Sequence, residues 1–228
     1  MEWYEAEVRE LEAARSRRQL PEHPVVFYGS SSIRLWESLG DDFRTRRILN
    51  LGFGGSTLEA CAYFFERVVV PVAPCSLVVY AGDNDLGDGR SPQEVLASFR
   101  ALAAKVDRYL GGIEFGFVSI KPSPGRFHLM DRIRMANRLI RGEIEVRRRG
   151  YFMDVFDAML DREGKPRRSL YHDDGLHLSL AGYGLWVELL TPYLHRILTT
   201  DCSSVKTTGL HSGSEARVPP MVQPKPRA

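Results

Sequence analysis

Short apolar runs alternate with longer helical patterns along most of this chain. Runs of β-type apolar residues recur over 25–28, 47–51, 77–81, 114–120 and 151–155. Apolar residues at helical spacing lie over 1–20, 57–70, 91–106, 131–149 and 179–194. Buried strands that alternate with helices predict a parallel sheet covered on both faces. We therefore predict an α/β fold: a three-layer α/β/α sandwich with a parallel sheet of about five strands.

Length and composition fit a single globular domain. The 228 residues are 43% hydrophobic and 26% charged, which is typical of a chain that buries one apolar core. Regular periodicity ends before residue 200, and residues 200–228 are rich in Ser, Thr, Gly and Pro. We predict one domain over 1–199, with a leading helix over 1–20, and a disordered tail over 200–228.

Charge and hydropathy exclude several classes of partner. A formal net charge of +2 gives no electrostatic reason to expect nucleic acid. No apolar run approaches the ~20 residues that a membrane span requires, and the first residues lack the pattern of a signal peptide. The cysteines, Cys61, Cys75 and Cys202, show no metal-ligand spacing and are odd in number, which favours reduced thiols. We expect a cytoplasmic protein without a membrane or nucleic-acid partner. The sequence leaves its oligomeric state open.

Polar and glycine-rich segments follow four of the predicted strands. Residues 29–32 (Gly-Ser-Ser-Ser) follow the first strand, residues 52–57 the second and residues 82–85 the third. Residues 174–177 (Asp-Gly-Leu-His) come after the fifth strand, just before the last helix. Ligand sites on open parallel sheets form beyond the carboxyl ends of the strands. We therefore expect these four segments to meet at one edge of the sheet.

The four segments supply the groups that acyl transfer requires. A serine hydroxyl is a poor nucleophile until a base takes its proton, and a histidine base works best when a carboxylate holds its ring. The spacing of Asp174 and His177 lets one turn of backbone present both groups side by side. The glycine-rich segments offer amide donors for the oxyanion of a tetrahedral intermediate. Chemistry alone leaves the nucleophile open among Ser30, Ser31 and Ser32.

In their order, these segments resemble the four sequence blocks of the SGNH hydrolases, also called the GDSL family of esterases and lipases. Residues 29–36 resemble the first block, Gly-Asp-Ser-Leu/Ile with a Trp soon after. Residues 50–55 resemble Asn-x-Gly-x-x-Gly, residues 82–85 resemble Gly-x-Asn-Asp, and residues 174–177 resemble Asp-x-x-His. The likeness covers roughly residues 25–195 and implies the flavodoxin-like fold of that family. Four blocks in the same order are hard to obtain by chance.

The resemblance implies a role for each matching residue. Ser31 occupies the position of the nucleophile, His177 that of its base and Asp174 that of the carboxylate that orients the base. The implied oxyanion hole consists of the backbone N–H groups of Ser31 and Gly55 and the side-chain amide of Asn84. The resemblance therefore implies a serine esterase that needs neither a metal nor an organic cofactor.

The residues of the first block also suggest a substrate. Residues 30–36 resemble a bacterial branch near the platelet-activating-factor acetylhydrolase-like members, which implies a short-acyl ester of a small molecule or saccharide. Arg126, on a loop after Pro122 and Pro124, is a candidate for contact with that substrate.

Other interpretations stay open. Ser30 stands where the family has Asp, which is compatible with a non-catalytic module that recognises a saccharide or acylated polymer. Transfer of the acyl group to an alcohol instead of water would use the same residues. Asp83, Asp85 and Asp88 suggest calcium, but their loop lacks the spacing of an EF-hand.

Overall fold

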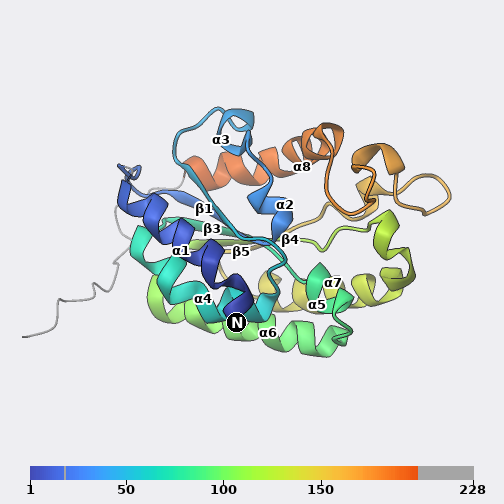
Figure 1. The fold of residues 1–228 in the computed structure, drawn as a ribbon, viewed down its shortest axis with the longest axis horizontal. Helices are drawn as coiled ribbons and strands as arrows, with labels where there is room; N and C mark the ends of the chain where they lie inside the picture. Colours follow the sequence, from blue (N-terminus) through green and yellow to red (C-terminus); the bar gives the residue numbers. More distant parts are fainter. Residues whose placement is uncertain (18, 200–228) are drawn as a thin grey trace, which may run out of the picture.

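The computed structural model describes residues 1–17 and 19–199, so the predicted tail over 200–228 lies outside the described residues. Its centre is one sheet of five parallel strands in the order β2-β1-β3-β4-β5. Figure 1 shows this sheet between helices. The strands are β1 (Val25–Gly29), β2 (Ile48–Gly52), β3 (Ser76–Tyr80), β4 (Glu114–Val118) and β5 (Gly150–Met153). The predicted fold, a parallel sheet of five strands between helices, is confirmed.

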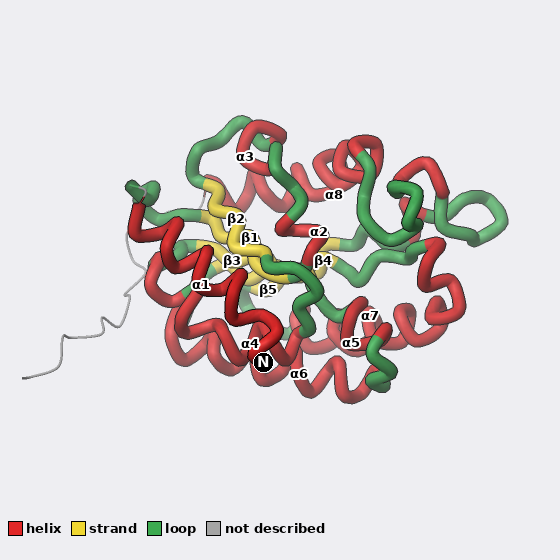
Figure 2. The backbone as a smooth tube through the Cα atoms, viewed as in Figure 1, coloured by secondary structure: helices red, strands yellow, loops and turns green. Residues whose placement is uncertain are grey.

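Helices cover both faces of the sheet (Figure 2). One face carries α1 (Glu2–Arg17), α4 (Leu58–Val68), α6 (Pro92–Leu110) and α7 (Met130–Glu145). The other carries α2 (Ser31–Arg34), α3 (Leu39–Asp42) and α8 (Leu180–Thr199). A short helix, α5 (Asp83–Gly87), follows β3. The remaining short 3-10 helices are η1 (Val70–Val72), η2 (Pro124–Leu129), η3 (Asp157–Met159) and η4 (Arg168–Leu170).

The continuous apolar character of the strands follows from these two layers of helices. In β1, Val26 and Tyr28 pack in the core beneath α4 and α6, whereas Val25 and Phe27 pack in the core beneath α8. All four are fully buried, because neighbouring side chains of a strand point to opposite faces and both faces are covered.

Several elements end earlier than the sequence pattern predicts, and β4 and α7 show the physical reason most clearly. The apolar run over 114–120 extends beyond the end of β4. At Ile120 the side chain of Asn137 on α7 accepts the backbone N–H at 2.7 Å and donates to the backbone carbonyl at 2.9 Å. The helical pattern over 131–149 outlasts α7, because a turn from Ile144 to Gly150 leads directly into β5. In both places a tertiary contact or a turn replaces the regular backbone hydrogen bonds.

Within residues 1–17 and 19–199, no helix combines the length and the apolar character that crossing a membrane requires. Cys61 and Cys75 are both buried free thiols, and burial raises the pKa of the Cys61 thiol far above its ordinary value.

Candidate active site

The chain turns sharply between β1 and α2, and this turn presents Ser31. Gly29 ends β1 with φ +140, and a Cβ atom there would lie 1.9 Å from the carbonyl oxygen of Tyr80 on β3. Only glycine fits this backbone and this close approach. The N–H of Ser30 then donates to the same Tyr80 oxygen at 2.9 Å. Ser31 is thereby placed as the first residue of α2, beyond the carboxyl end of β1.

The loop before α8 brings a histidine and a carboxylate to this serine. Nε2 of His177 lies 3.2 Å from Oγ of Ser31, and Nδ1 lies 2.6 Å from Oδ2 of Asp174. If Nδ1 carries the ring proton and donates it to Asp174, then Nε2 is free to accept the proton of the Ser31 hydroxyl. The three groups therefore form a continuous line of hydrogen bonds.

Asp174 is held in its charged form. Its Oδ1 accepts the N–H groups of Leu176 and His177 at 2.8 and 3.0 Å, and its Oδ2 faces the His177 ring. Partial burial opposes ionisation, but these hydrogen bonds hold the pKa of Asp174 well below its ordinary value. The carboxylate can therefore fix the ring and stabilise an imidazolium.

The three consecutive serines have different surroundings. The hydroxyl of Ser31 lies within hydrogen-bonding distance of His177, whereas Oγ of Ser30 is buried without a partner in the described residues. Ser32 is also buried, and its carbonyl accepts the hydroxyl of Tyr183 at 3.1 Å. Geometry thus separates Ser31 from its neighbours, which chemistry alone could not do.

The loop after β2 carries Gly55. In the described part of the chain its N–H forms no hydrogen bond, so it is available to a ligand. Two contacts from α1 hold the peptide groups on either side of it. Oε2 of Glu7 accepts the N–H of Gly54 at 2.7 Å, and the hydroxyl of Tyr4 donates to the carbonyl of Gly55 at 3.3 Å. The sequence pattern predicted α1 as a leading helix but gave no sign that Tyr4 and Glu7 reach this loop.

Asn84 lies on α5, after β3. Its Nδ2 donates to the carbonyl of Ser56 at 3.1 Å, which joins it to the loop that carries Gly55. Its Oδ1 accepts Nη2 of Arg126 at 2.9 Å. The second backbone donor is Ser31, because the N–H of the first residue of a helix has no partner within that helix. The predicted oxyanion donors Ser31, Gly55 and Asn84 therefore lie in the three segments that directly follow β1, β2 and β3.

Arg126 points into the protein. Its Nη1 lies 3.0 Å from Oδ2 of Asp83, and 17% of its side chain is exposed. Nζ of Lys121 lies 3.2 Å from the same carboxylate oxygen and 3.1 Å from the hydroxyl of Tyr80. Burial lowers the pKa of Lys121, and the two cations hold the pKa of the buried Asp83 below its ordinary value. The predicted contact of Arg126 with substrate stays a prediction.

Asp85 connects this region to α4. Both of its carboxylate oxygens accept the N–H of Leu58, at 3.0 and 3.1 Å, at the first turn of α4. Burial raises the pKa of Asp85 to about 6, although the hydrogen bond from Leu58 opposes this shift.

Among the described residues, His, Cys, Asp and Glu side chains form no group of three that could hold a metal ion.

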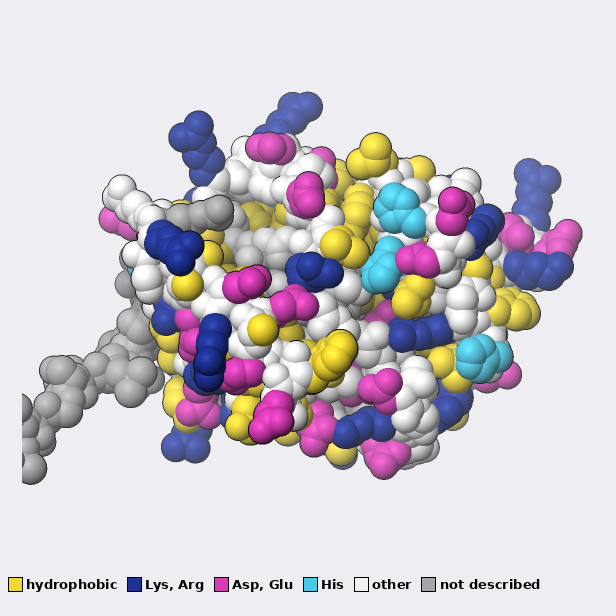
Figure 3. All heavy atoms as spheres, viewed as in Figure 1, with side chains coloured by type: hydrophobic (Ala, Val, Ile, Leu, Met, Phe, Trp, Pro, Cys, Tyr) yellow, Lys and Arg dark blue, Asp and Glu magenta, His cyan; other side chains and the backbone are white. Residues whose placement is uncertain are grey.

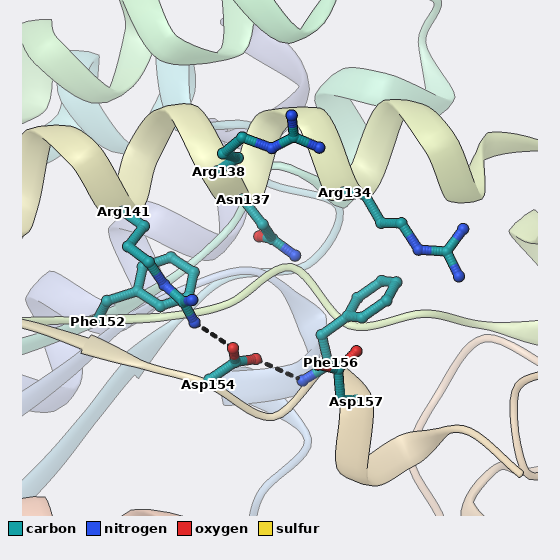
Figure 4. A pocket seen from close by; sticks show the side chains of 8 residues that line it. All are labelled: Arg134, Asn137, Arg138, Arg141, Phe152, Asp154, Phe156 and Asp157. Carbon is teal, nitrogen blue, oxygen red and sulfur yellow. Dashed lines mark hydrogen bonds and ion pairs between the residues drawn. The ribbon is translucent and has the colours of Figure 1, made fainter. Parts of the chain in front are cut away.

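A separate cavity of about 250 Å³ lies between α7 and the segment after β5 (Figure 4). It is lined by Arg134, Asn137, Arg138, Arg141, Phe152, Asp154, Phe156 and Asp157. Its central carboxylate is already paired, because Asp154 binds Arg141 and accepts the N–H of Phe156. None of the predicted site residues lines it.

Over the face of the molecule in Figure 3, acidic and basic side chains are interspersed.

Comparisons with known proteins identify the family of this chain. A model of the GDSL-like lipase/acylhydrolase family matches residues 26–185, so the chain belongs to this family. The match begins after α1. A comparison with curated proteins finds no match.

Solved structures share the fold at low sequence identity. A Streptococcus pneumoniae protein provisionally described as a platelet activating factor has a TM-score of 0.73 at 24% identity, covering 85% of this chain and 95% of its own. A GDSL-like lipase from Bacteroides thetaiotaomicron has a TM-score of 0.70 at 20% identity, covering 83% and 97%. A mutant acetyl-xylooligosaccharide esterase from Geobacillus has a TM-score of 0.60 at 14% identity, covering 80% and 96%. At these identities the likeness establishes the fold alone.

Proposed function

We propose that this protein is a serine hydrolase that cleaves carboxylic esters with short acyl groups. The observation that supports this most directly is the line of hydrogen bonds from Asp174 through His177 to Ser31, at 2.6 and 3.2 Å. Membership of the GDSL-like lipase/acylhydrolase family favours the same chemistry.

In the proposed mechanism, Oγ of Ser31 attacks the carbonyl carbon of the ester while Nε2 of His177 takes the hydroxyl proton. Asp174 stabilises the imidazolium. The negative oxygen of the tetrahedral intermediate accepts the N–H groups of Ser31 and Gly55 and the amide of Asn84. When the intermediate collapses, His177 returns its proton to the departing alcohol, which leaves an acyl group on Ser31. Water then attacks this acyl group through the same base and releases the carboxylic acid.

The proposed substrate is a short-acyl ester of a small molecule or saccharide. The resemblance of the first block to acetylhydrolase-like proteins supports this. One structural neighbour is described as an acetyl-xylooligosaccharide esterase, which is compatible with an acetylated saccharide.

Hydrolysis of p-nitrophenyl acetate, butyrate and octanoate by the full chain tests the proposal. We expect the rate to fall with acyl length, and we expect Ser31→Ala to abolish turnover while Ser30→Ala, at the buried hydroxyl next to it, retains it. A fluorophosphonate probe should add its mass to the peptide that contains Ser31. Absence of both turnover and labelling would favour the non-catalytic recognition module.

Acyl transfer to an alcohol is distinguished by the products. With methanol or glycerol added, a hydrolase releases mainly free acid, whereas a transferase forms the new ester. We expect free acid, because the proposal requires water to reach the acyl group on Ser31.

A further inference from the structure

The side chain of Asn84 has only one favourable orientation. An amide can rotate by 180°, which exchanges its donor and its acceptor at little steric cost. Here Oδ1 accepts Nη2 of Arg126 at 2.9 Å, and Nδ2 donates to the carbonyl of Ser56 at 3.1 Å. Rotation would set NH₂ against a guanidinium and Oδ1 against a carbonyl. In the observed orientation, one of the two hydrogens on Nδ2 is left for a ligand.

Arg126 is itself held by charge. Asp83 and Asn84 are consecutive on α5, and the guanidinium bridges them, with Nη1 3.0 Å from Oδ2 of Asp83. Lys121 approaches the same oxygen at 3.2 Å. The side chains of Asp83 and Lys121 are 6% and 1% exposed, so neither charge has water as an alternative partner. Moving Arg126 away would weaken the pairing of a buried carboxylate, which is costly.

The three charges sum to a formal +1 beside the Asn84 amide. In a region with little water, a charge acts over a longer range than at the surface. A cationic donor on Oδ1 also polarises the amide, so its N–H becomes a stronger donor. Both effects favour a full negative charge on the reacting oxygen over the neutral carbonyl of the substrate. Effects of this kind act on the transition state and therefore on kcat.

We propose that Arg126 is a positioning residue of the oxyanion hole, anchored by Asp83 and Lys121, that orients and polarises the amide of Asn84. In this role it acts through Asn84 and does not touch the substrate. The inference rests on the proposed function.

The first test measures kcat and KM for p-nitrophenyl acetate in wild type and in Arg126→Ala. Loss of an oxyanion donor costs about 10²–10³-fold in rate, so loss of the group behind it should cost about 10–10²-fold in kcat with little change in KM. Arg134→Ala, an exposed arginine on α7, is the matched control and should keep the wild-type kcat. Guanidinium ion added to Arg126→Ala should restore part of the rate, because it can occupy the vacated place.

A double-mutant cycle separates positioning from a general structural role. If Arg126 acts through Asn84, then Arg126→Ala should lower kcat in the wild-type background and have almost no effect in the Asn84→Ala background. A structural role would lower kcat by the same factor in both backgrounds. If Arg126→Ala does not fold, Arg126→Gln, which keeps an amide donor without the charge, takes its place in the same cycle.

The outcomes for the two proposals are distinguishable. If wild type neither hydrolyses the esters nor reacts with the fluorophosphonate, the proposed function is wrong. If wild type is active but the arginine variant keeps its kcat within about twofold, or the cycle is additive, the positioning role is wrong and the proposed function stands.

Discussion

Oε2 of Glu7 accepts the N–H of Gly54 at 2.7 Å, which ties the N-terminal helix to the loop of a proposed oxyanion donor. The helix is fixed in turn by Arg67 on α4, whose guanidinium binds Glu5 and Glu12 of α1 at 3.0 and 2.8 Å. Because the family match begins at residue 26, this contact comes from a part of the chain outside the matched region. Helix α1 therefore belongs to the structure that supports the candidate site.

Glu7→Ala should lower the rate of ester hydrolysis. Without the acceptor, the peptide groups around Gly55 gain freedom, and the loss of one hydrogen bond of this kind corresponds to about 3- to 10-fold in kcat. Glu7→Gln should keep most of the rate, because its amide oxygen can accept the same N–H. Glu10→Ala, an exposed residue of the same helix, is the control. A wild-type kcat for Glu7→Ala would show that the loop holds itself in place.

Asp174→Asn should impair catalysis without unfolding the protein. The asparagine oxygen can still accept the N–H groups of Leu176 and His177, but its NH₂ would face Nδ1 and favour the wrong ring tautomer. We expect kcat to fall by about 10²–10⁴-fold, with little change in the far-UV circular dichroism spectrum. A much smaller effect would mean that water or another residue orients His177.

Gly29→Ala should destabilise the fold strongly. The added Cβ would lie 1.9 Å from a backbone oxygen of Tyr80, which only a shift of β1 or β3 can relieve. We expect a loss of more than about 3 kcal/mol in the free energy of unfolding, measured by urea denaturation. Gly89→Ala is the control: its φ of +91 is also positive, but nothing lies within 4 Å of the added atom. Backbone strain alone should cost it about 1–2 kcal/mol, and equal losses at both positions would contradict the steric argument.

Asp85→Asn should change how stability depends on pH. Because the pKa of Asp85 is raised to about 6, its protonated form favours the folded state. That contribution is complete below the ordinary pKa of aspartate and is lost as the pH rises through about 6. The asparagine stays neutral. Between pH 4 and 7 the free energy of unfolding of the variant should therefore rise, relative to that of wild type, by on the order of 3 kcal/mol. Urea denaturation of both proteins at each pH measures this difference, and a difference that is the same at every pH would refute the raised pKa.

Much of the fold is predictable from local pattern. Apolar runs that continue on both faces of a strand require cover on both sides, as Val25 to Tyr28 show, and this requirement leads to the three layers. The spacing of Asp174 and His177 likewise needs only one turn of backbone to bring the two side chains together. Spacing of this kind is local information, and it is contained in the order of the residues.

Other features depend on the packing of distant segments. Ser31 and His177 are 146 residues apart, and nothing near either residue encodes the 3.2 Å between their side chains. The same holds for Glu7 on Gly54 and for Arg126 between Asp83 and Asn84. Periodicity records how deeply each segment is buried, but a side-chain partner depends on where separate elements finally lie. Local pattern is therefore enough to predict the layered sheet and the polar segments at its carboxyl edge, whereas the contact between Ser31 and His177 and the residues that hold the loops in place depend on how distant segments pack.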